Sequence, residues 1–134
     1  IQYHGIGVTG AFIVGLDSDK QSVFCNLYNF ILQNHVYPSN ITILTPFPGT
    51  RLRQRLEEEN RLLSSNWENY TGYNVNHALK NISSEELTNT LAQLYKKIYS
   101  EEIYVKNLEY FKKLQKLYFF DKIKKDKQSI NKKD

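Results

Sequence analysis

The stretch GAFIVGLDSD, residues 10–19, decides the fold. Its apolar residues from Ala11 to Leu16 run without polar alternation and are interrupted only by Gly15. Such a run predicts a parallel strand covered on both faces, from about residue 8 to residue 16. A glycine at the end of the strand lets a ligand or another backbone approach closely. Because ligands bind at the carboxyl ends of parallel strands, we expect the functional edge here.

The next residues predict a βαβ unit. Residues 20–34 carry apolar residues at helical spacing, and Pro38 follows them. The β-branched run ITIL, residues 41–44, predicts a second covered strand parallel to the first. The rigid loop TPFPGT, residues 45–50, should therefore lie at the same edge as Gly15.

Polar residues in these loops predict where helices begin and end. We expect the acidic and hydroxyl side chains of residues 17–19 to cap the helix after the first strand. Thr50 should cap a helix that buries Leu52 and Leu56 and exposes its arginines, and Asn60 should end it. Asp17 and Asp19 leave a second interpretation open, in which they bind a cation or a ribose.

The C-terminal half predicts a polar loop followed by helices. Residues 64–81 are irregular, with aromatic residues that we expect to close the core rather than line a pocket. Ser83 and Glu86 form a capping box before an apolar stripe that extends to Tyr99, and Ser100 should cap a further helix. From residue 121 only two residues are apolar, which predicts a frayed or disordered basic tail. The predicted parts are residues 1–63, 64–120 and 121–134.

Composition limits the possible functions. The 134 residues suffice for one modest core, and the formal charge of +4 is concentrated after residue 111. The lysines there are expected to form a solvated tail, with nucleic-acid contact as the less favoured interpretation. No apolar run is long enough to span a membrane and no signal peptide is evident, so we expect a cytoplasmic protein. The sequence starts at Ile1 and has no Met, which suggests a piece of a longer protein.

The possible metal ligands are few. Cys25 is the only cysteine, so the chain can form neither an internal disulfide nor a multi-cysteine metal site, and we expect an ordinary helix residue. His4, His35 and His77 lack the spacing of metal ligands and are expected at the surface.

Two stretches together resemble a known enzyme family. Residues 10–19 and the stretch ITILTPFPGTRL, residues 41–52, are similar to the last strands of a radical S-adenosylmethionine enzyme barrel. The DSD and PFPGT stretches and residues 98–100 resemble the subgroup with an N-terminal cobalamin-binding domain, and the helices from Ser83 resemble its C-terminal extension. The resemblance covers about residues 1–120. It implies an α/β fold, with a partial parallel (β/α) barrel fragment of order βαβα followed by a C-terminal helical extension.

The resemblance also implies a cofactor site. In the family, an isoleucine in a Gly-x-Ile-x-Gly-like strand contacts the adenine of S-adenosylmethionine, and the end of the next strand contacts the same ring through its backbone. The matching positions here, expected to bind the cofactor, are Ile13, Gly15, Leu44, Thr45 and Pro46. Two positions depart from the pattern, since its first glycine falls on Ala11 and its acidic residue is represented by Asp19.

The family's iron–sulfur motif has no counterpart in this chain. Three thiolates of a Cys-x-x-x-Cys-x-x-Cys loop bind a [4Fe–4S] cluster there, whereas this chain has only Cys25. The resemblance therefore implies activity for a parent enzyme, in which the ligands of the cluster and of cobalamin lie outside these residues. No catalytic residue is named for the chain itself.

Two functions from different classes follow. The favoured one is a C-terminal fragment of a cobalamin-dependent radical S-adenosylmethionine enzyme, a methyltransferase or another C–H-activating catalyst. Its partners would be the missing N-terminal part of the same enzyme and a small-molecule or lipid substrate, with no nucleic acid and no transmembrane segment expected. The alternative is a non-catalytic α/β-helical interaction module with a basic tail.

Overall fold

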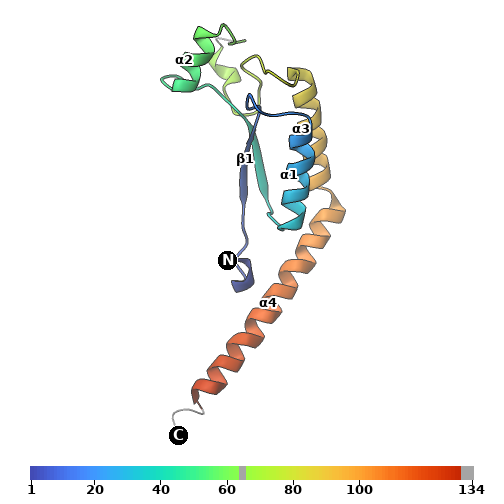
Figure 1. Cartoon of the computed structure of the whole chain (residues 1–134). Coiled ribbons are helices and arrows are strands. Elements are labelled where there is room, and N and C mark those ends of the chain that lie inside the picture. Colours follow the sequence, from blue (N-terminus) through green and yellow to red (C-terminus); the bar gives the residue numbers. More distant parts are fainter. Residues whose placement is uncertain (64–65, 131–134) are drawn as a thin grey trace.

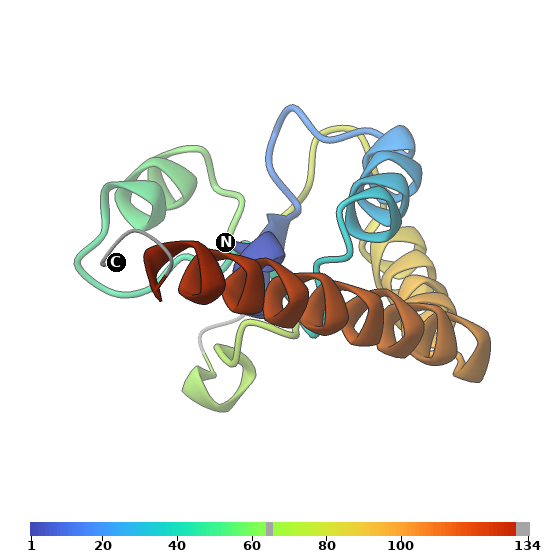
Figure 2. The ribbon, with the colours of Figure 1, turned by 90° about the horizontal axis from the view of Figure 1, so that it is seen from below.

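The computed structural model describes residues 1–63 and 66–130. A two-stranded parallel sheet packs against helices, and a long last helix extends away from this body (Figure 1). Seen from below, this helix passes in front of the N-terminal segment (Figure 2). In chain order the elements are η1 (Gln2–His4), β1 (Gly10–Val14), α1 (Ser22–Gln33), β2 (Ser39–Ile43), α2 (Arg51–Glu58), η2 (Trp67–Asn69), α3 (Ser84–Ile98) and α4 (Glu101–Ile130).

The predicted βαβ unit is confirmed. β1 pairs with β2 in parallel, from Gly10 opposite Ser39 to Val14 opposite Ile43, and α1 connects the two strands. β1 is shorter than the predicted strand of residues 8–16. The fold is mixed α/β, and the described residues form no closed barrel.

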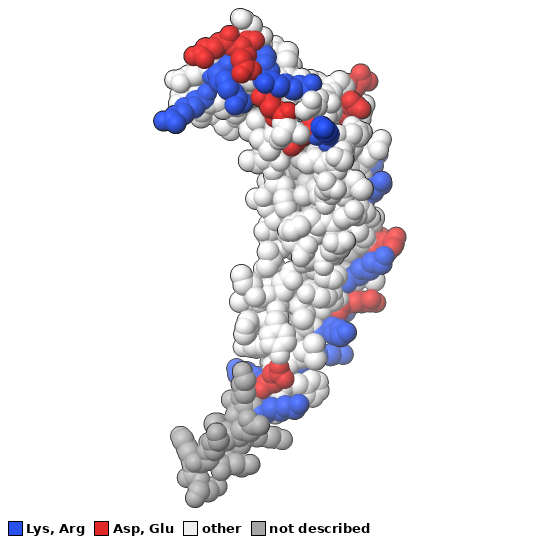
Figure 3. Space-filling view, viewed as in Figure 1, with Lys and Arg blue, Asp and Glu red and all other residues white. Residues whose placement is uncertain are grey.

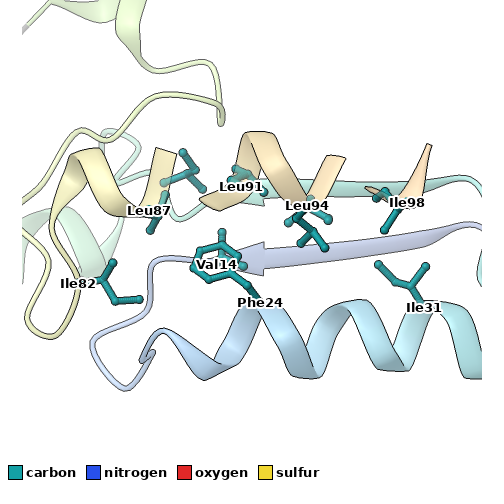
Figure 4. Close-up of a cluster of buried hydrophobic side chains, with 10 residues drawn as sticks. Val14, Phe24, Ile31, Ile82, Leu87, Leu91, Leu94 and Ile98 are labelled. Atoms are coloured by element: carbon teal, nitrogen blue, oxygen red, sulfur yellow. The ribbon is translucent and has the colours of Figure 1, made fainter. Parts of the chain in front are cut away.

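The core lies on one face of the sheet. Side chains of α1 and α3 pack against Val14 of β1 (Figure 4), and Ile41 and Ile43 of β2 belong to the same buried cluster. The helix residues buried in this cluster are Phe24, Ile31, Leu87, Leu91, Leu94 and Ile98, which include most of the predicted stripe of α3.

The other face of β1 is open, so the prediction of a strand covered on both faces is wrong for the described chain. Ala11 is exposed and Ile13 is 57% exposed, whereas Val14 is buried. α1 and α3 both lie on the same side of the sheet (Figure 1), and no described element covers Ala11 and Ile13.

Tyr95 of α3 and Tyr99, which directly follows this helix, close the outer edge of β2. The Tyr95 hydroxyl accepts a hydrogen bond from the Ile41 amide, at 2.9 Å, and donates one to the Ile41 carbonyl oxygen, at 2.8 Å. Tyr99 bonds the backbone of Ser39 in the same way. Farther along the strand the Ile43 amide donates to the Gly72 carbonyl oxygen. These bonds occupy the backbone groups to which a further strand would pair.

We expect Tyr95→Phe to destabilise the fold by about 1–2 kcal/mol, because it leaves two backbone groups of Ile41 without partners. Urea unfolding measures this change. Tyr104→Phe removes a hydroxyl at an exposed position and should change the free energy of unfolding by less than about 0.5 kcal/mol. Equal values for the two variants would contradict the role of Tyr95 at this edge.

The predicted helix caps are confirmed except at α1. The Thr50 hydroxyl accepts from the Arg53 amide, and Ser83 with Glu86 forms the capping box. Asn60 has the expected positive φ of 53° after α2. α1 begins after Gln21, which makes no side-chain cap. The prediction that residues 17–19 cap this helix is therefore wrong, because their two carboxylates bind elsewhere.

The aromatic residues of the loop after α2 differ in their burial. Tyr70 is buried, as expected, but Trp67 and Tyr73 are more than half exposed. The guanidinium of Arg53 lies over both the Trp67 and the Tyr70 rings. Arg53 is therefore largely covered, with 16% of its side chain exposed, rather than placed on an outer face as the sequence suggested.

α4 continues to Ile130 without interruption. A frayed or disordered tail from residue 121 is thus wrong for residues 121–130, and residues 131–134 lie outside the described chain. The sequence after residue 100 has no Gly or Pro, and lysine favours helix, so nothing ends the helix locally. The division into three parts stays a prediction. Within the described ranges, no helix combines the length and the apolar character needed to cross a membrane.

Candidate functional site

The ends of the two strands lie at one edge of the sheet, as predicted. The Leu44 amide donates to the Val14 carbonyl oxygen at 2.8 Å, which extends the parallel ladder past both strands. Gly15 follows directly with φ +90°. This carboxyl edge is the candidate site.

The five predicted cofactor residues differ in their exposure to solvent. Ile13 lies on the open face, opposite Thr42 in the ladder. Leu44 and Thr45 are half-buried, and Pro46 is fully buried. The apolar side chain of Ile13 is therefore accessible to a ligand, whereas the side chain of Pro46 is not.

Asp19 holds the turn at Gly15. Its Oδ2 accepts hydrogen bonds from the amides of Gly15, at 2.9 Å, and Leu16, at 3.0 Å. A Cβ added to Gly15 would point toward Ile43, Leu79 and Leu87, at 3.5–3.6 Å, which is ordinary contact with buried or half-buried side chains. The glycine is therefore needed for its positive φ, and not to leave space for a ligand.

Asp17 forms the centre of an ionic cluster beside this turn. Its Oδ1 lies 2.5 Å from Arg61 Nη2, and its Oδ2 lies 3.1 Å from Nη1. Arg55 and Lys80 approach the same carboxylate at 3.4 and 3.5 Å. The hydrogen bonds from Arg61 lower the pKa of Asp17 to about 2. Figure 3 shows that acidic and basic side chains gather at this end of the molecule, over α2.

This cluster joins the turn to the loop that follows α2. Arg61 also donates to the Ala78 carbonyl oxygen and to Glu59, and the Asn81 side chain donates to the Asp17 carbonyl oxygen. The carboxylate of Asp17 is thus bound by cations of the same chain, and Asp19 by backbone amides. Both carboxylates are occupied in turn and loop contacts, which explains why neither caps α1.

His77 is a residue of the edge that the sequence did not indicate. It is 1% exposed and forms an isolated antiparallel bridge with Leu62, and it lies close enough to Gly15 for the backbone of that residue to act on the pKa of its ring. Burial lowers the pKa of its ring. Its Nδ1 has no hydrogen-bond partner among the described residues. A surface position is therefore wrong for His77, and no spacing pattern in the loop could have indicated its burial.

The other predicted single residues lie away from the edge. His4 is exposed as expected, and His35 is half-buried against Tyr110, with ring centroids 3.6 Å apart. Cys25 is exposed on α1. Within residues 1–63 and 66–130, no group of three or more His, Cys, Asp or Glu side chains could hold a metal ion.

Comparisons with known proteins find relatives named as methyltransferases. Residues 50–133 match the model of the family described as domain of unknown function DUF4070. The chain is 29% identical to bacteriochlorophyllide d C-12(1)-methyltransferase of Chlorobaculum tepidum, over 79% of the chain and 23% of that protein. An uncharacterized methyltransferase of Pyrococcus horikoshii is 30% identical over 71% of the chain and 21% of its own length. Bacteriochlorophyllide d C-8(2)-methyltransferase of Chlorobaculum tepidum is 26% identical over 53% of the chain and 16% of its length.

No solved structure matches the chain. The chain spans about a fifth of the length of the curated relatives it matches. The family match covers more than half of the chain and includes α2, α3 and α4. The chain therefore belongs to the DUF4070 family, and its sequence is that of the C-terminal part of a radical S-adenosylmethionine enzyme of the cobalamin-binding subgroup.

Proposed function

We propose that the chain supplies the adenine side of the S-adenosylmethionine site in a cobalamin-dependent radical methyltransferase. The observation that carries this proposal is the exposure of Ile13 on the open face, at the carboxyl end of β1. A large apolar side chain that is 57% exposed, beside an otherwise well-packed core, suits the flat face of an adenine ring. The names of the relatives support methyl transfer as the reaction class.

The two edges of the sheet support a place at the end of a partial barrel. The amide of Gly10 and the carbonyl oxygens of Val8 and Val14 bond toward β2 and its flanks. Since bonding alternates along a parallel strand, the backbone groups of Ala11 and Ile13 point to the opposite edge of β1. In the described chain β2 is the only strand that pairs with β1. One edge is thus closed by tyrosines, and the other is free to accept a strand.

We propose the N-terminal part of the same enzyme as the partner at this free edge. A preceding barrel strand would pair with Ala11 and Ile13 and would place further binding residues around the open face. This arrangement also accounts for an unalternating apolar run whose second face is open in the described chain. The alternative, a non-catalytic interaction module, uses the same free edge for a different partner and requires no cofactor.

The residues present fit one of the implied cofactors better than the others. S-adenosylmethionine supplies a methyl group and a source of radicals when bound, and Ile13 with the backbone of Leu44 and Thr45 would hold its adenine. A [4Fe–4S] cluster does not fit, because three thiolates are required and Cys25 is alone and exposed. The ligands of the cluster and of cobalamin would come from outside these residues.

The substrate is proposed only as a class, a small molecule or a lipid. Two relatives are named for bacteriochlorophyllide d, but they match this chain at 26–29% identity over less than a quarter of their length. Substrate contacts come from loops and extensions that differ between enzymes on one fold.

Binding of the cofactor to Ile13 variants of the full-length enzyme tests the proposal. We expect Ile13→Ala to weaken S-adenosylmethionine binding roughly tenfold, since it removes apolar contact with the adenine. The exposure of Ile13 predicts little change in melting temperature.

Val105→Ala is the matched control, because Val105 is also β-branched and is 42% exposed on α4, away from the sheet edge. Its affinity for S-adenosylmethionine should equal that of the unmodified enzyme. Calorimetric titration measures both variants. An unchanged affinity in Ile13→Ala would remove β1 from the cofactor site, and an enzyme that binds no S-adenosylmethionine at all would favour the interaction module.

A further inference from the structure

α4 has one face that packs against the rest of the chain and one face that does not. Near its start, Ile103 and Asn107 are buried. Farther along, the Tyr118 ring contacts the His4 ring edge-to-face, and Asp121 accepts a hydrogen bond from the Tyr3 hydroxyl. The packed face of α4 is therefore the side that meets the N-terminal segment.

The opposite side carries large apolar residues beside lysines. Phe119, Phe120 and Ile123 are 62%, 64% and 51% exposed. With Gln115 and two lysines they line a shallow depression of about 360 Å³, made entirely of α4 side chains. We call Lys112, Lys116, Phe119, Phe120 and Ile123 the basic aromatic face. Positions 112, 116, 119 and 123 follow the spacing of one helical face.

Residues 109–124 of α4 carry an excess of positive charge. Residues 109–124 contain five lysines and two acidic residues, and one of these two, Asp121, is bonded to Tyr3. Figure 3 shows lysines along α4 below the body of the molecule. The helix extends away from the sheet and its covering helices (Figure 1), so the outer side of this half is not shielded by them.

We propose that the basic aromatic face binds the surface of an anionic lipid bilayer. Exposed aromatic rings partition into the headgroup region, and lysine stems lie along apolar surface while their charges reach anionic headgroups. A bilayer takes up such side chains without a matching pocket, which suits the exposed side of a single helix. A second copy docked on the same face would bring like charges together at close range, which opposes dimerisation. The proposal is independent of the cofactor site.

Sedimentation of the full-length protein with lipid vesicles tests this proposal. We expect binding to mixed phosphatidylglycerol and phosphatidylcholine vesicles, and roughly tenfold weaker binding to vesicles of phosphatidylcholine alone. Both Phe119→Ser/Phe120→Ser and Lys112→Glu/Lys116→Glu should lower the affinity for the anionic vesicles at least tenfold. All four positions are exposed, so an unchanged circular dichroism melt is expected and checks the fold.

Lys96→Glu/Lys97→Glu is the matched control, because it makes the same change in charge at exposed positions of α3. It should leave most of the vesicle binding intact. Equal loss in this control would indicate attraction by net charge, and full binding by the phenylalanine variant would exclude insertion of the rings. Either result overturns the proposal. So does an absence of vesicle binding, or a concentration-dependent dimer that the face variants dissociate.

Discussion

Leu87→Ala is expected to lower the free energy of unfolding by about 2–5 kcal/mol, which is among the largest effects of any single change in this chain. Leu87 has no exposed surface and belongs to the core cluster between the sheet and α3. Its removal loses apolar burial and leaves a cavity that the surrounding side chains of the core cannot fill completely. The midpoint of urea or thermal unfolding measures the loss.

Leu87 also supports the turn at the carboxyl edge of the sheet. Its Cδ1 would lie 3.5 Å from a Cβ at Gly15, so the turn after β1 rests on this side chain. We therefore expect Leu87→Ala to increase hydrogen exchange at the amides of Gly15 and Leu16 as well as to reduce stability.

A leucine at an exposed position provides the control. Leu117→Ala makes the same chemical change at a residue that is 44% exposed on α4. It should cost less than about 1 kcal/mol and should not affect exchange at the turn. A similar cost for both variants would mean that the cluster beneath the sheet is not the main core.

The sequence predicts elements whose signals are local. The apolar run at residues 10–16, the periodicity of α3 and the capping box at Ser83 each lie within a few residues, and each is found at its expected place. The limits of such signals are also visible. Hydrophobicity alone indicated two covered faces for β1, but only the positions of α1 and α3 decide which face is buried.

The residues that the sequence missed act through distant contacts. Arg61 is one arginine among several near α2, and its importance comes from Asp17, which lies 44 positions earlier. His77 is buried because an irregular loop returns to pair with Leu62. No spacing rule links such pairs of distant residues, so a single sequence cannot reveal their contacts. The five predicted cofactor residues, by contrast, came from a family resemblance, and their role stays a prediction.

Arg61→Ala is the second change for which we expect a large effect, about 2–3 kcal/mol of destabilisation. The Arg61 side chain is 13% exposed, and its guanidinium donates to Asp17, Glu59 and the Ala78 carbonyl oxygen. The alanine variant removes the Arg61 hydrogen bonds to these three acceptors, two of them charged, and leaves Asp17 only the longer contacts with Arg55 and Lys80. Arg55→Ala removes a more exposed arginine, 3.4 Å from the same carboxylate, and should cost less than about 1 kcal/mol.

The dependence of stability on pH tests the same pair without removing the arginine. The pKa of Asp17 is about 2 in the folded protein and 3.8 for the ordinary side chain. Because the folded value is the lower one, the pair contributes its full stability above the ordinary pKa and loses it as the pH falls toward 2. Glu59, whose pKa Arg61 also lowers, acts in the same direction.

Asp17→Asn should therefore be less stable than the unmodified protein near neutral pH, by an amount that shrinks as the pH falls from about 4 toward 2. The asparagine cannot form the charged pair at any pH, so its own stability changes less across this range. Urea unfolding of both proteins at several pH values gives the two curves. A constant difference between them down to the lowest pH would show that the charge of Asp17 is not what joins the turn after β1 to the loop at Arg61.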